Sequence, residues 1–318
     1  MNSALLPEFD SVDEVQAWLL SALLRDGEAV SPRGMETREL TGIAFRLRNP
    51  RRRCISSPAR KFHLPLAIGE FAWHMRADDD VAGLAYYAKR WRDFAEDGHR
   101  ITGSCYGSKI FRARGEIASQ WTRLKKVLHD DPFSRRAVLL LWDDSGLDSG
   151  ALDVPCTSTI QFLIRNSRVH AVVAMRSNDT IWGVPYDVFL FTMLQEYLAC
   201  ELGLDVGEYT HFASSMHLYQ RHYDLASKIL AEPLASFEMP AMSDPWQLDA
   251  FLLCEREIRE NLSSAPETLA LLDRYWGALG EVLLWYRDRR RGASPCSVDA
   301  SPYRPFLRSA DSTAAKVA

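Results

Sequence analysis

The stretch CTSTIQFLIRNSRVHAVVAMR, residues 156–176, decides the fold. Two runs rich in apolar and β-branched residues, 156–164 and 169–176, predict β-strands. The dipeptide Asn166-Ser167 between them is typical of a hairpin turn. Strands joined by a short turn pair antiparallel. The stretch therefore predicts an antiparallel sheet near the middle of the chain.

Helices are expected on both sides of this hairpin. Apolar residues recur at helical spacing, and they predict helices over 12–27, 64–73, 81–95, 185–202 and 220–232, with two more within 246–287. Further strands are expected over 40–47, 137–142 and 207–219. The Ser-, Ala- and Pro-rich text beyond Arg291 predicts a largely mobile tail. The fold class is therefore predicted to be α+β, with a mostly antiparallel sheet flanked by helices.

Composition narrows the function. The chain has 318 residues, 47% of them hydrophobic, and a net charge of −4, which argues against a general nucleic-acid binder. The six cysteines are scattered and show no metal-ligand spacing, so we expect a reducing compartment and no metal. The N-terminal residues are acidic where a signal peptide is basic, and no apolar run reaches membrane-spanning length. We expect a cytoplasmic protein with no membrane partner.

Cys156 is the first candidate for chemistry, because it follows a proline at the start of a predicted strand. A lone cysteine is more often a small buried residue. Arg176 ends the partner strand of the hairpin, so an arginine is expected near the thiol, where it favours the thiolate. Arg135 and Arg136 precede another strand. Their planar guanidinium groups suit a phosphate, although such a pair alone is more often a solvated strand end.

Several motifs, in this order and spacing, resemble the thymidylate synthase family. They are DPFSRR (131–136), PCTSTIQF (155–162), MRSNDTIWGVPYD (175–187) and HLYQRHY (217–223). The helix around Glu70 fits as well. The resemblance covers roughly residues 12–232. It implies a catalytic domain over 1–232 with the family's fold, followed by a helical extension and tail over 233–318, packed on the same domain.

The resemblance also implies roles for individual residues. Cys156 would be the nucleophile that adds to C6 of a pyrimidine nucleoside monophosphate. Other catalytic roles would fall to Glu70, Tyr106, Arg176 and Asp187. Substrate contacts would come from Arg33, Arg135, Arg136, Gln161, Arg176, Ser177, Asp187, His217 and Tyr219, with Arg135 and Arg136 crossing the interface of a homodimer. The co-substrate 5,10-methylenetetrahydrofolate would be bound by Trp91, Asp179, Gly183 and Tyr186.

Asp187 is a departure from the family pattern, because thymidylate synthases have asparagine there. The amide accepts from N3–H and donates to O4 of uracil, whereas cytosine offers an acceptor at N3 and a donor at N4. A neutral carboxyl donates to N3 and accepts from N4–H₂, or a carboxylate pairs with an N3-protonated cytosine. Thr157 stands where the family usually has histidine, also toward the base. The alternative is that Asp187 caps a helix starting near Pro185.

This departure resembles the cytidylate hydroxymethylase branch of the family, which finishes with water and yields a 5-hydroxymethylcytosine nucleotide. His217 and Tyr219 address the 3′ side of the sugar, so CMP and dCMP both stay open. The 31 arginines against 7 lysines fit a GC-rich genome, which favours the CMP enzymes of nucleoside-antibiotic pathways over phage dCMP enzymes.

Three alternatives stay open at this point. The first is a folate-dependent methylase acting on UMP, dUMP or dCMP. The second is a regulator that binds a nucleotide without catalysis. The third is nucleic-acid binding through 51–53 or 289–291, which has the weakest support because short basic runs are usually solvated.

Overall fold

The computed structural model describes residues 6–95, 97–147, 150, 153–294 and 301–308. Contacts divide the chain into two compact units, each assembled from separate segments. The first comprises Met1–Phe62, Trp121–Asp143 and Pro155–Met239. The second comprises His63–Gln120, Asp144–Val154 and Pro240–Ala318. The domain boundary expected near residue 232 stays a prediction.

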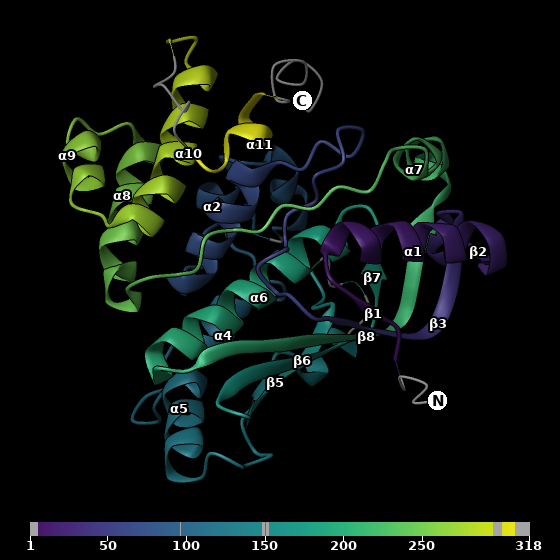
Figure 1. The fold of residues 1–318 in the computed structure, drawn as a ribbon, viewed down its shortest axis with the longest axis horizontal. Helices are drawn as coiled ribbons and strands as arrows, with labels where there is room; N and C mark the ends of the chain where they lie inside the picture. Colours follow the sequence, from purple (N-terminus) through teal and green to yellow (C-terminus); the bar gives the residue numbers. More distant parts are fainter. Residues whose placement is uncertain (1–5, 96, 148–149, 151–152, 295–300, 309–318) are drawn as a thin grey trace. The chain divides into compact units, whose positions relative to one another are not determined.

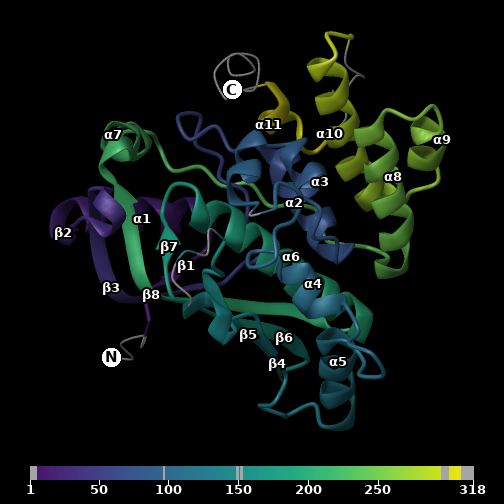
Figure 2. The same cartoon turned by 180° about the vertical axis from the view of Figure 1, so that it is seen from behind.

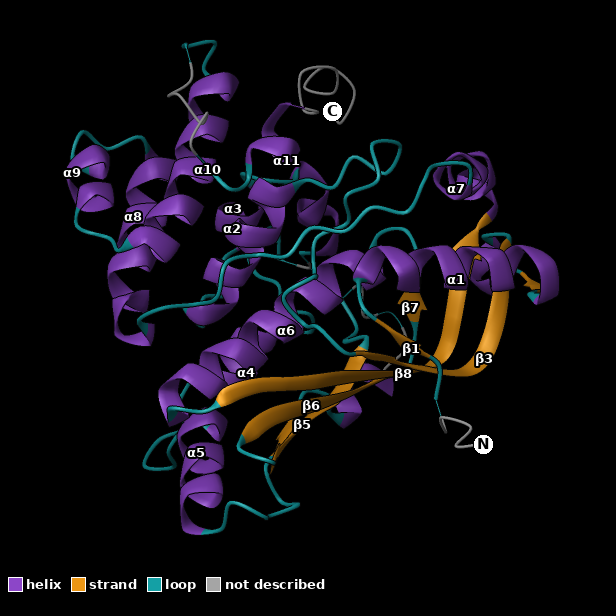
Figure 3. Ribbon diagram, viewed as in Figure 1, coloured by secondary structure: helices purple, strands orange, loops and turns teal. Residues whose placement is uncertain are grey.

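The first unit is built on a mixed sheet, whose strands are orange in Figure 3. Within the described residues the strand order is β1-β3-β8-β6-β5-β4, with β2 paired to β3 and β7 paired to β8. The bounds are β1 Glu8–Phe9, β2 Glu28–Val30, β3 Thr37–Leu47, β4 Val138–Leu140, β5 Thr157–Arg165, β6 Arg168–Met175, β7 Asn178–Asp179 and β8 Asp205–Tyr219. The β1–β3, β6–β8 and β7–β8 pairs are parallel. The remaining pairs are antiparallel.

The hairpin of β5 and β6 forms as the sequence predicts. Asn166 and Ser167 both have positive φ angles, 52° and 57°, as a two-residue type I′ turn requires. The register places Thr157 opposite Met175. The two residues just outside this pair, Cys156 and Arg176, are therefore neighbours at the end of the hairpin.

The helices of the first unit are α1 Val12–Asp26, α5 Gln120–Asp130, α6 Gly183–Leu202 and α7 Tyr223–Leu230. The helices α1 and α6 pack on this sheet, and α7 packs on α1. Figure 1 shows α1 over β3 and β8, and α6 over β6 and β8. The helix α6 lies on the crossover that parallel strands such as β6 and β8 require. The predicted α+β fold with a mostly antiparallel sheet is confirmed.

The second unit is mainly helical. Its helices are α2 Leu64–Met75, α3 Val81–Ala85, α4 Tyr106–Phe111, α8 Leu248–Glu260, α9 Ala265–Ala270, α10 Arg274–Arg290 and α11 Arg304–Arg308. Figures 1 and 2 both show α8 and α10 beside α2, although they are far apart in the sequence. The ring of Trp276 joins them, with centroids 6.5 Å from Phe71 and 5.1 Å from Phe251. No helix among the described residues combines the length and apolarity needed to cross a membrane.

A buried ionic cluster also joins α8 to α2. Glu255 of α8 is fully buried and accepts hydrogen bonds from Tyr87 Oη at 2.8 Å and Arg259 Nε at 3.1 Å. It also pairs with Arg76, which caps the C-terminus of α2. Buried charges are tolerated only when they are paired and hydrogen-bonded. The cluster therefore fixes the end of α2 against the C-terminal helices.

Two helix predictions were wrong. The helix expected over 81–95 is α3 followed by a separate 3₁₀ helix, Lys89–Phe94, because Tyr87 turns into the core to reach Glu255. The segment 246–287 contains three helices, α8, α9 and α10, where two were expected. Asn261 adopts a left-handed conformation with φ 59° and ends α8. A helix end that depends on one residue barely changes the hydrophobic periodicity, so the pattern does not reveal it.

Candidate active site

The thiol of Cys156 lies at the entry to β5, beside Arg176. The Arg176 Nη2 atom is 3.7 Å from Cys156 Sγ, and the Arg176 backbone N–H donates to Cys156 O at 2.9 Å. The cysteine is half-buried and its thiol is reduced. A guanidinium beside a partly accessible thiol favours the thiolate, which is the nucleophilic form.

Two further contacts hold the Arg176 side chain. Its Nε donates to the carbonyl oxygen of Pro155 at 2.8 Å. Its guanidinium carbon lies 5.6 Å from the ring centroid of Trp142, within the range of a cation–π contact. The guanidinium is therefore positioned by the protein before any anion arrives.

The short strand β7 brings the next residues to the end of β8. Asp179 lies opposite His217, and Ser177 Oγ is 3.5 Å from His217 Nδ1. Burial lowers the pKa of His217, while the charges of Asp179 and Glu39 oppose this shift. A neutral imidazole at this position can donate to or accept from a hydroxyl.

Positively charged side chains lie near Tyr219. Its ring lies 4.1 Å from the guanidinium carbon of Arg221. Burial and the charge of Asp179 raise the pKa of Tyr219, and the guanidiniums of Arg221 and Arg33 act in the opposite direction. These arginines therefore lie within electrostatic range of the same ring. The guanidinium of Arg176 acts in the same way on His217, two residues before Tyr219. A phosphate monoester matches such a cluster.

Arg135 and Arg136 precede β4 and are both exposed. Neither forms an ion pair with any residue that the structure describes. Gln161, expected to contact substrate, donates from Nε2 to the carbonyl oxygen of Arg135 at 2.8 Å. This bond fixes the backbone that carries the two arginines. The substrate roles of all three residues stay predictions.

Asp187 lies inside α6, not at its end. The N-cap of the helix is Trp182, so the alternative that Asp187 caps the helix is wrong. Burial raises the pKa of Asp187 to about 7; the charge of Asp179 adds to this shift, and the nearby amide of Asn178 opposes it. Near neutral pH the carboxyl is therefore present in both protonation states.

Other predicted site residues belong to the second unit. Glu70 is half-buried on α2, one turn before His74 on the same face. The ring of Tyr106 stacks on His74 with centroids 5.5 Å apart, and His74 Nδ1 accepts from the N–H of Gly107 at 3.2 Å. Burial lowers the pKa of His74 to about 3, so this ring is neutral. The roles of Glu70 and Tyr106 stay predictions.

Comparison with known proteins places this geometry in context. Residues 17–253 match the family described as thymidylate synthase, which is most of the chain. The chain belongs to the thymidylate synthase family. Members of this family are enzymes that modify C5 of pyrimidine nucleotides with methylenetetrahydrofolate, and they are typically dimeric.

A relative from Bacillus phage SP01 is named deoxyuridylate hydroxymethyltransferase. It is 26% identical over 242 residues, which are 71% of this chain and 63% of the relative. The chain therefore spans less than two thirds of that relative's length. The relative's name describes that protein alone. The family membership of this chain rests on the match over residues 17–253.

The folate of the family would require a carboxylate acceptor beside aromatic rings. In the first unit, Asp179 is half-buried and its Oδ1 accepts from the N–H of Ile181 at 2.8 Å. Tyr186 packs on Phe62 at 5.1 Å and on the guanidinium of Arg60 at 5.6 Å. These residues match the chemistry of a pteridine ring, whose N–H groups need an acceptor. In the second unit, Trp91 lies 6.4 Å from Trp73, and its folate role stays a prediction.

Gly183, the first residue of α6, is constrained by its neighbours. A β-carbon added there would lie 2.0 Å from Asn178 Oδ1 and 3.3 Å from Asp187 Oδ2. Any side chain would therefore displace the Asn178 amide. This close packing is an observed reason for glycine at a position that family resemblance had linked to folate.

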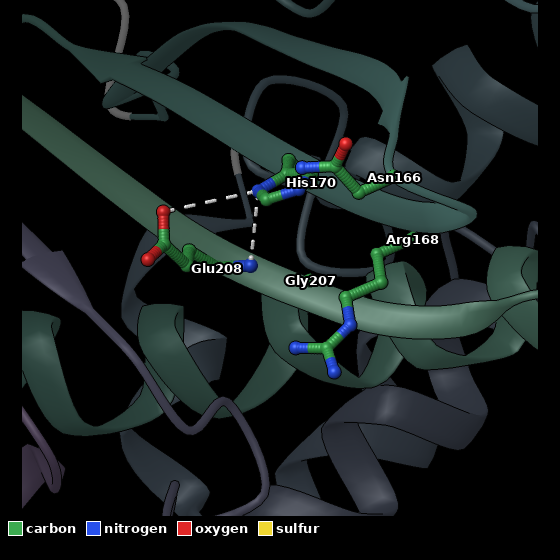
Figure 4. Close-up of a pocket in the computed structure, with 5 residues that line it drawn as sticks. All are labelled: Asn166, Arg168, His170, Gly207 and Glu208. Atoms are coloured by element: carbon green, nitrogen blue, oxygen red, sulfur yellow. Dashed lines mark hydrogen bonds and ion pairs between the residues drawn. The ribbon is translucent and has the colours of Figure 1, made fainter.

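One hollow on the sheet of this thymidylate synthase-family chain lies away from the predicted site residues. It has a volume of about 400 Å³ and is lined by Asn166, Arg168, His170, Gly207 and Glu208. Figure 4 draws these five residues as sticks. His170 Nδ1 accepts from the N–H of Glu208 at 3.1 Å. None of the residues predicted to bind nucleotide or folate lines it. In the described part of the chain, no group of three or more His, Cys, Asp or Glu side chains could hold a metal ion.

Several residues that contact the candidate site residues, directly or through one another, were not predicted from the sequence. They are Arg60, Trp142, Asn178, Tyr209, His211 and Arg221. One signal was present, because Arg221 lies within the motif HLYQRHY. Alternation along β8 gave none for His211, because the buried positions change phase between Ala213 and Met216. Trp142 and Arg60 gave no signal, since their partners are distant in the sequence.

The raised pKa of Asp187 predicts a pH dependence of stability. Between about pH 4 and about pH 7 the folded state keeps this proton and the unfolded state loses it, so the free energy of unfolding falls as pH rises through this window. Asp187→Asn removes the effect. The Tm of the variant relative to wild type is therefore expected to increase from pH 5 to pH 8, measured by calorimetry. A constant difference across that range would contradict a buried, titrating Asp187.

Proposed function

We propose that this chain is a cytidylate 5-hydroxymethylase, acting on CMP or dCMP with 5,10-methylenetetrahydrofolate. The observation that carries the proposal is Asp187, a carboxyl at the family's base-reading position whose pKa is raised to about 7 by burial. In its neutral form it donates to N3 of cytosine and accepts from N4–H₂. Uracil offers the opposite pattern at both atoms.

The chemistry would start at Cys156. Its thiolate adds to C6 of the pyrimidine, which makes C5 nucleophilic. Arg176 lies 3.7 Å from the sulfur, where it stabilises the thiolate; it also contributes to the phosphate site. Arg33 and Ser177 complete that site, and His217 and Tyr219 hold the sugar. The folate supplies a one-carbon unit at the oxidation level of formaldehyde.

Glu70 and Tyr106 would serve the proton transfers of the reaction. A partly desolvated glutamate suits this work because its pKa can approach the working pH. C5 would bond to the one-carbon unit and lose its proton, and departure of tetrahydrofolate would leave an exocyclic methylene on C5. Water would then add to this methylene with loss of a proton, and the thiolate would leave C6. We also propose a homodimer, in which the exposed Arg135 and Arg136 reach the phosphate of the neighbouring subunit.

A second candidate has a specific observation in its favour. The phage relative, 26% identical, is named for the hydroxymethylation of deoxyuridylate, so the same reaction on dUMP is the main alternative. A methylase acting on UMP, dUMP or dCMP is the next. The family match does not favour the non-catalytic regulator.

One experiment separates these functions. The protein is incubated with methylenetetrahydrofolate and, separately, CMP, dCMP, UMP and dUMP, and the products are weighed by mass spectrometry. A gain of CH₂O on CMP or dCMP supports the proposal and identifies the sugar. The same gain on dUMP supports the alternative, and a gain of CH₂ on any nucleotide identifies a methylase.

Asp187→Asn is expected to reverse the base preference. The amide leaves cytosine with mismatched donors and acceptors, so the kcat/KM ratio of cytosine to uracil nucleotide should fall by roughly 10- to 100-fold. Thr192→Val is the matched control: Thr192 is buried on the same helix, and its hydroxyl bonds only to carbonyl oxygens of α6. An unchanged ratio in Asp187→Asn would refute the base-reading role.

A further inference from the structure

A chain of buried polar groups leads away from Asp187. Asn178 of β7 is 2% exposed, and its Nδ2 lies 3.2 Å from His211 Nε2. His211 of β8 is fully buried and stacks on Phe45, with centroids 4.9 Å apart. Its other nitrogen, Nδ1, lies 2.8 Å from the hydroxyl of the buried Tyr209. The three side chains therefore form a continuous hydrogen-bonded series.

The other end of the Asn178 amide faces Asp187. Its Oδ1 is buried and meets no hydrogen-bond donor among the described residues. The position a β-carbon would occupy on Gly183 lies 2.0 Å from this oxygen and 3.3 Å from Asp187 Oδ2. The amide thus lies between the imidazole of His211 and the carboxyl of Asp187. A buried acceptor facing a carboxyl is satisfied when that carboxyl carries a proton.

An amide has one accepting and one donating end, so only two proton arrangements satisfy the whole series. In the first, Asp187 O–H donates to Asn178 Oδ1, Asn178 Nδ2–H donates to His211 Nε2, and His211 Nδ1–H donates to Tyr209 Oη. The second requires the amide to rotate. Tyr209 O–H then donates to His211 Nδ1, His211 Nε2–H donates to Asn178 Oδ1, and Asn178 Nδ2–H donates to the Asp187 carboxylate.

The first arrangement keeps Asp187 neutral and the second keeps it ionised. His211 stays neutral in both, because burial lowers its pKa to about 3. Among the described residues, Asp179 of β7 and Tyr209 of β8 lie within electrostatic range of Asp187, and His211 of β8 faces the series. The orientation of one amide is therefore tied to the charge of the base-reading carboxyl.

We propose that Asn178, backed by His211 and Tyr209, is a positioning residue that determines whether Asp187 meets the nucleotide base as a neutral acid or as a carboxylate. The inference rests on the proposed function, because it assumes that Asp187 reads the base. It extends base recognition to three residues that do not contact the substrate.

The test measures nucleotide binding without folate. Dissociation constants for CMP and UMP are determined by calorimetry from about pH 5.5 to about pH 8.5 for wild type, Asn178→Leu, Tyr209→Phe and the control Thr192→Val. In wild type, CMP affinity is expected to fall as pH rises through about 7, when Asp187 loses its proton. Asn178→Leu removes the donor that stabilises the carboxylate, so the midpoint should move up by roughly one pH unit.

Tyr209→Phe should also move the midpoint. The shift should be smaller, because Asn178 and His211 lie between Tyr209 and the carboxyl of Asp187. Thr192→Val should leave it in place. A purely packing role for Asn178 and Tyr209 would weaken CMP and UMP binding equally and leave the midpoint at the wild-type value, which would overturn the inference. Tyr209→Phe alone decides the matter if Asn178→Leu does not fold.

The two proposals fail in different ways. Preference of the wild-type protein for UMP at every pH would refute the proposed function. Preference for CMP in wild type, with midpoints unchanged in both variants, would refute only the inference about Asn178.

Discussion

Cys156→Ser is expected to lower kcat/KM by at least about 1000-fold while nucleotide binding persists. The serine hydroxyl keeps its proton near neutral pH, and the guanidinium of Arg176, 3.7 Å from the sulfur in the native site, stabilises a thiolate but does not generate an alkoxide. Loss of a nucleophile commonly costs several orders of magnitude in rate. Turnover is measured by product mass, and binding by calorimetry.

Cys200→Ser is the matched control. Cys200 is half-buried on α6, and burial together with the charge of Glu196 raises its pKa to about 11, so it is unreactive at neutral pH. Its replacement should leave turnover close to wild type. Iodoacetamide should likewise modify Cys156 before Cys105 or Cys254, whose pKa values burial raises to about 11 and about 12. More than a tenth of wild-type turnover in Cys156→Ser would exclude it as the nucleophile.

Glu255→Gln is expected to cost about 3–5 kcal/mol of stability in the second unit. The fully buried carboxylate neutralises Arg76 and Arg259 and accepts from the Tyr87 hydroxyl. An amide keeps the shape but removes the charge, and a broken buried ion pair is strongly destabilising. Urea unfolding gives the free energy, and hydrogen exchange should show faster opening of amides in α2 and α8.

Asp130→Asn controls for the loss of an ordinary ion pair. Asp130 pairs with Lys126 at 2.8 Å on the exposed face of α5, and such a pair contributes at most about 1 kcal/mol. Equal losses in Asp130→Asn and Glu255→Gln would show that burial adds nothing to the cluster. Since Glu70 lies on α2, the Glu255 variant also tests whether the candidate glutamate depends on support from α8.

Periodicity and turn chemistry predicted the elements that are regular over many residues. The hairpin of β5 and β6 and the helix α1 formed as expected. The division of 81–95 did not follow from periodicity, because Tyr87 leaves the helix to reach Glu255, which is 168 residues away. Local patterns do not report partners at that separation.

The same limit applies to the candidate site. The neighbourhood of Cys156 and Arg176 followed from the hairpin alone, because both residues flank one paired position. The Asn178–His211–Tyr209 series did not, because it joins β7 to β8 across the crossover helix α6. The protonation state of Asp187 depends on these neighbouring side chains. The sequence shows only that residue 187 has a carboxyl group.

The separate segments of the two units have a consequence for synthesis on the ribosome. The first unit contains no residue beyond Met239. The second unit requires α8 and α10, and α10 ends only at Arg290. At about 5–20 residues per second, the first unit is complete for several seconds before α10 emerges. Through that interval α2 lacks the partner that neutralises Arg76, so a nascent chain arrested after Met239 should expose α2 to proteases and chaperones while the sheet is already protected.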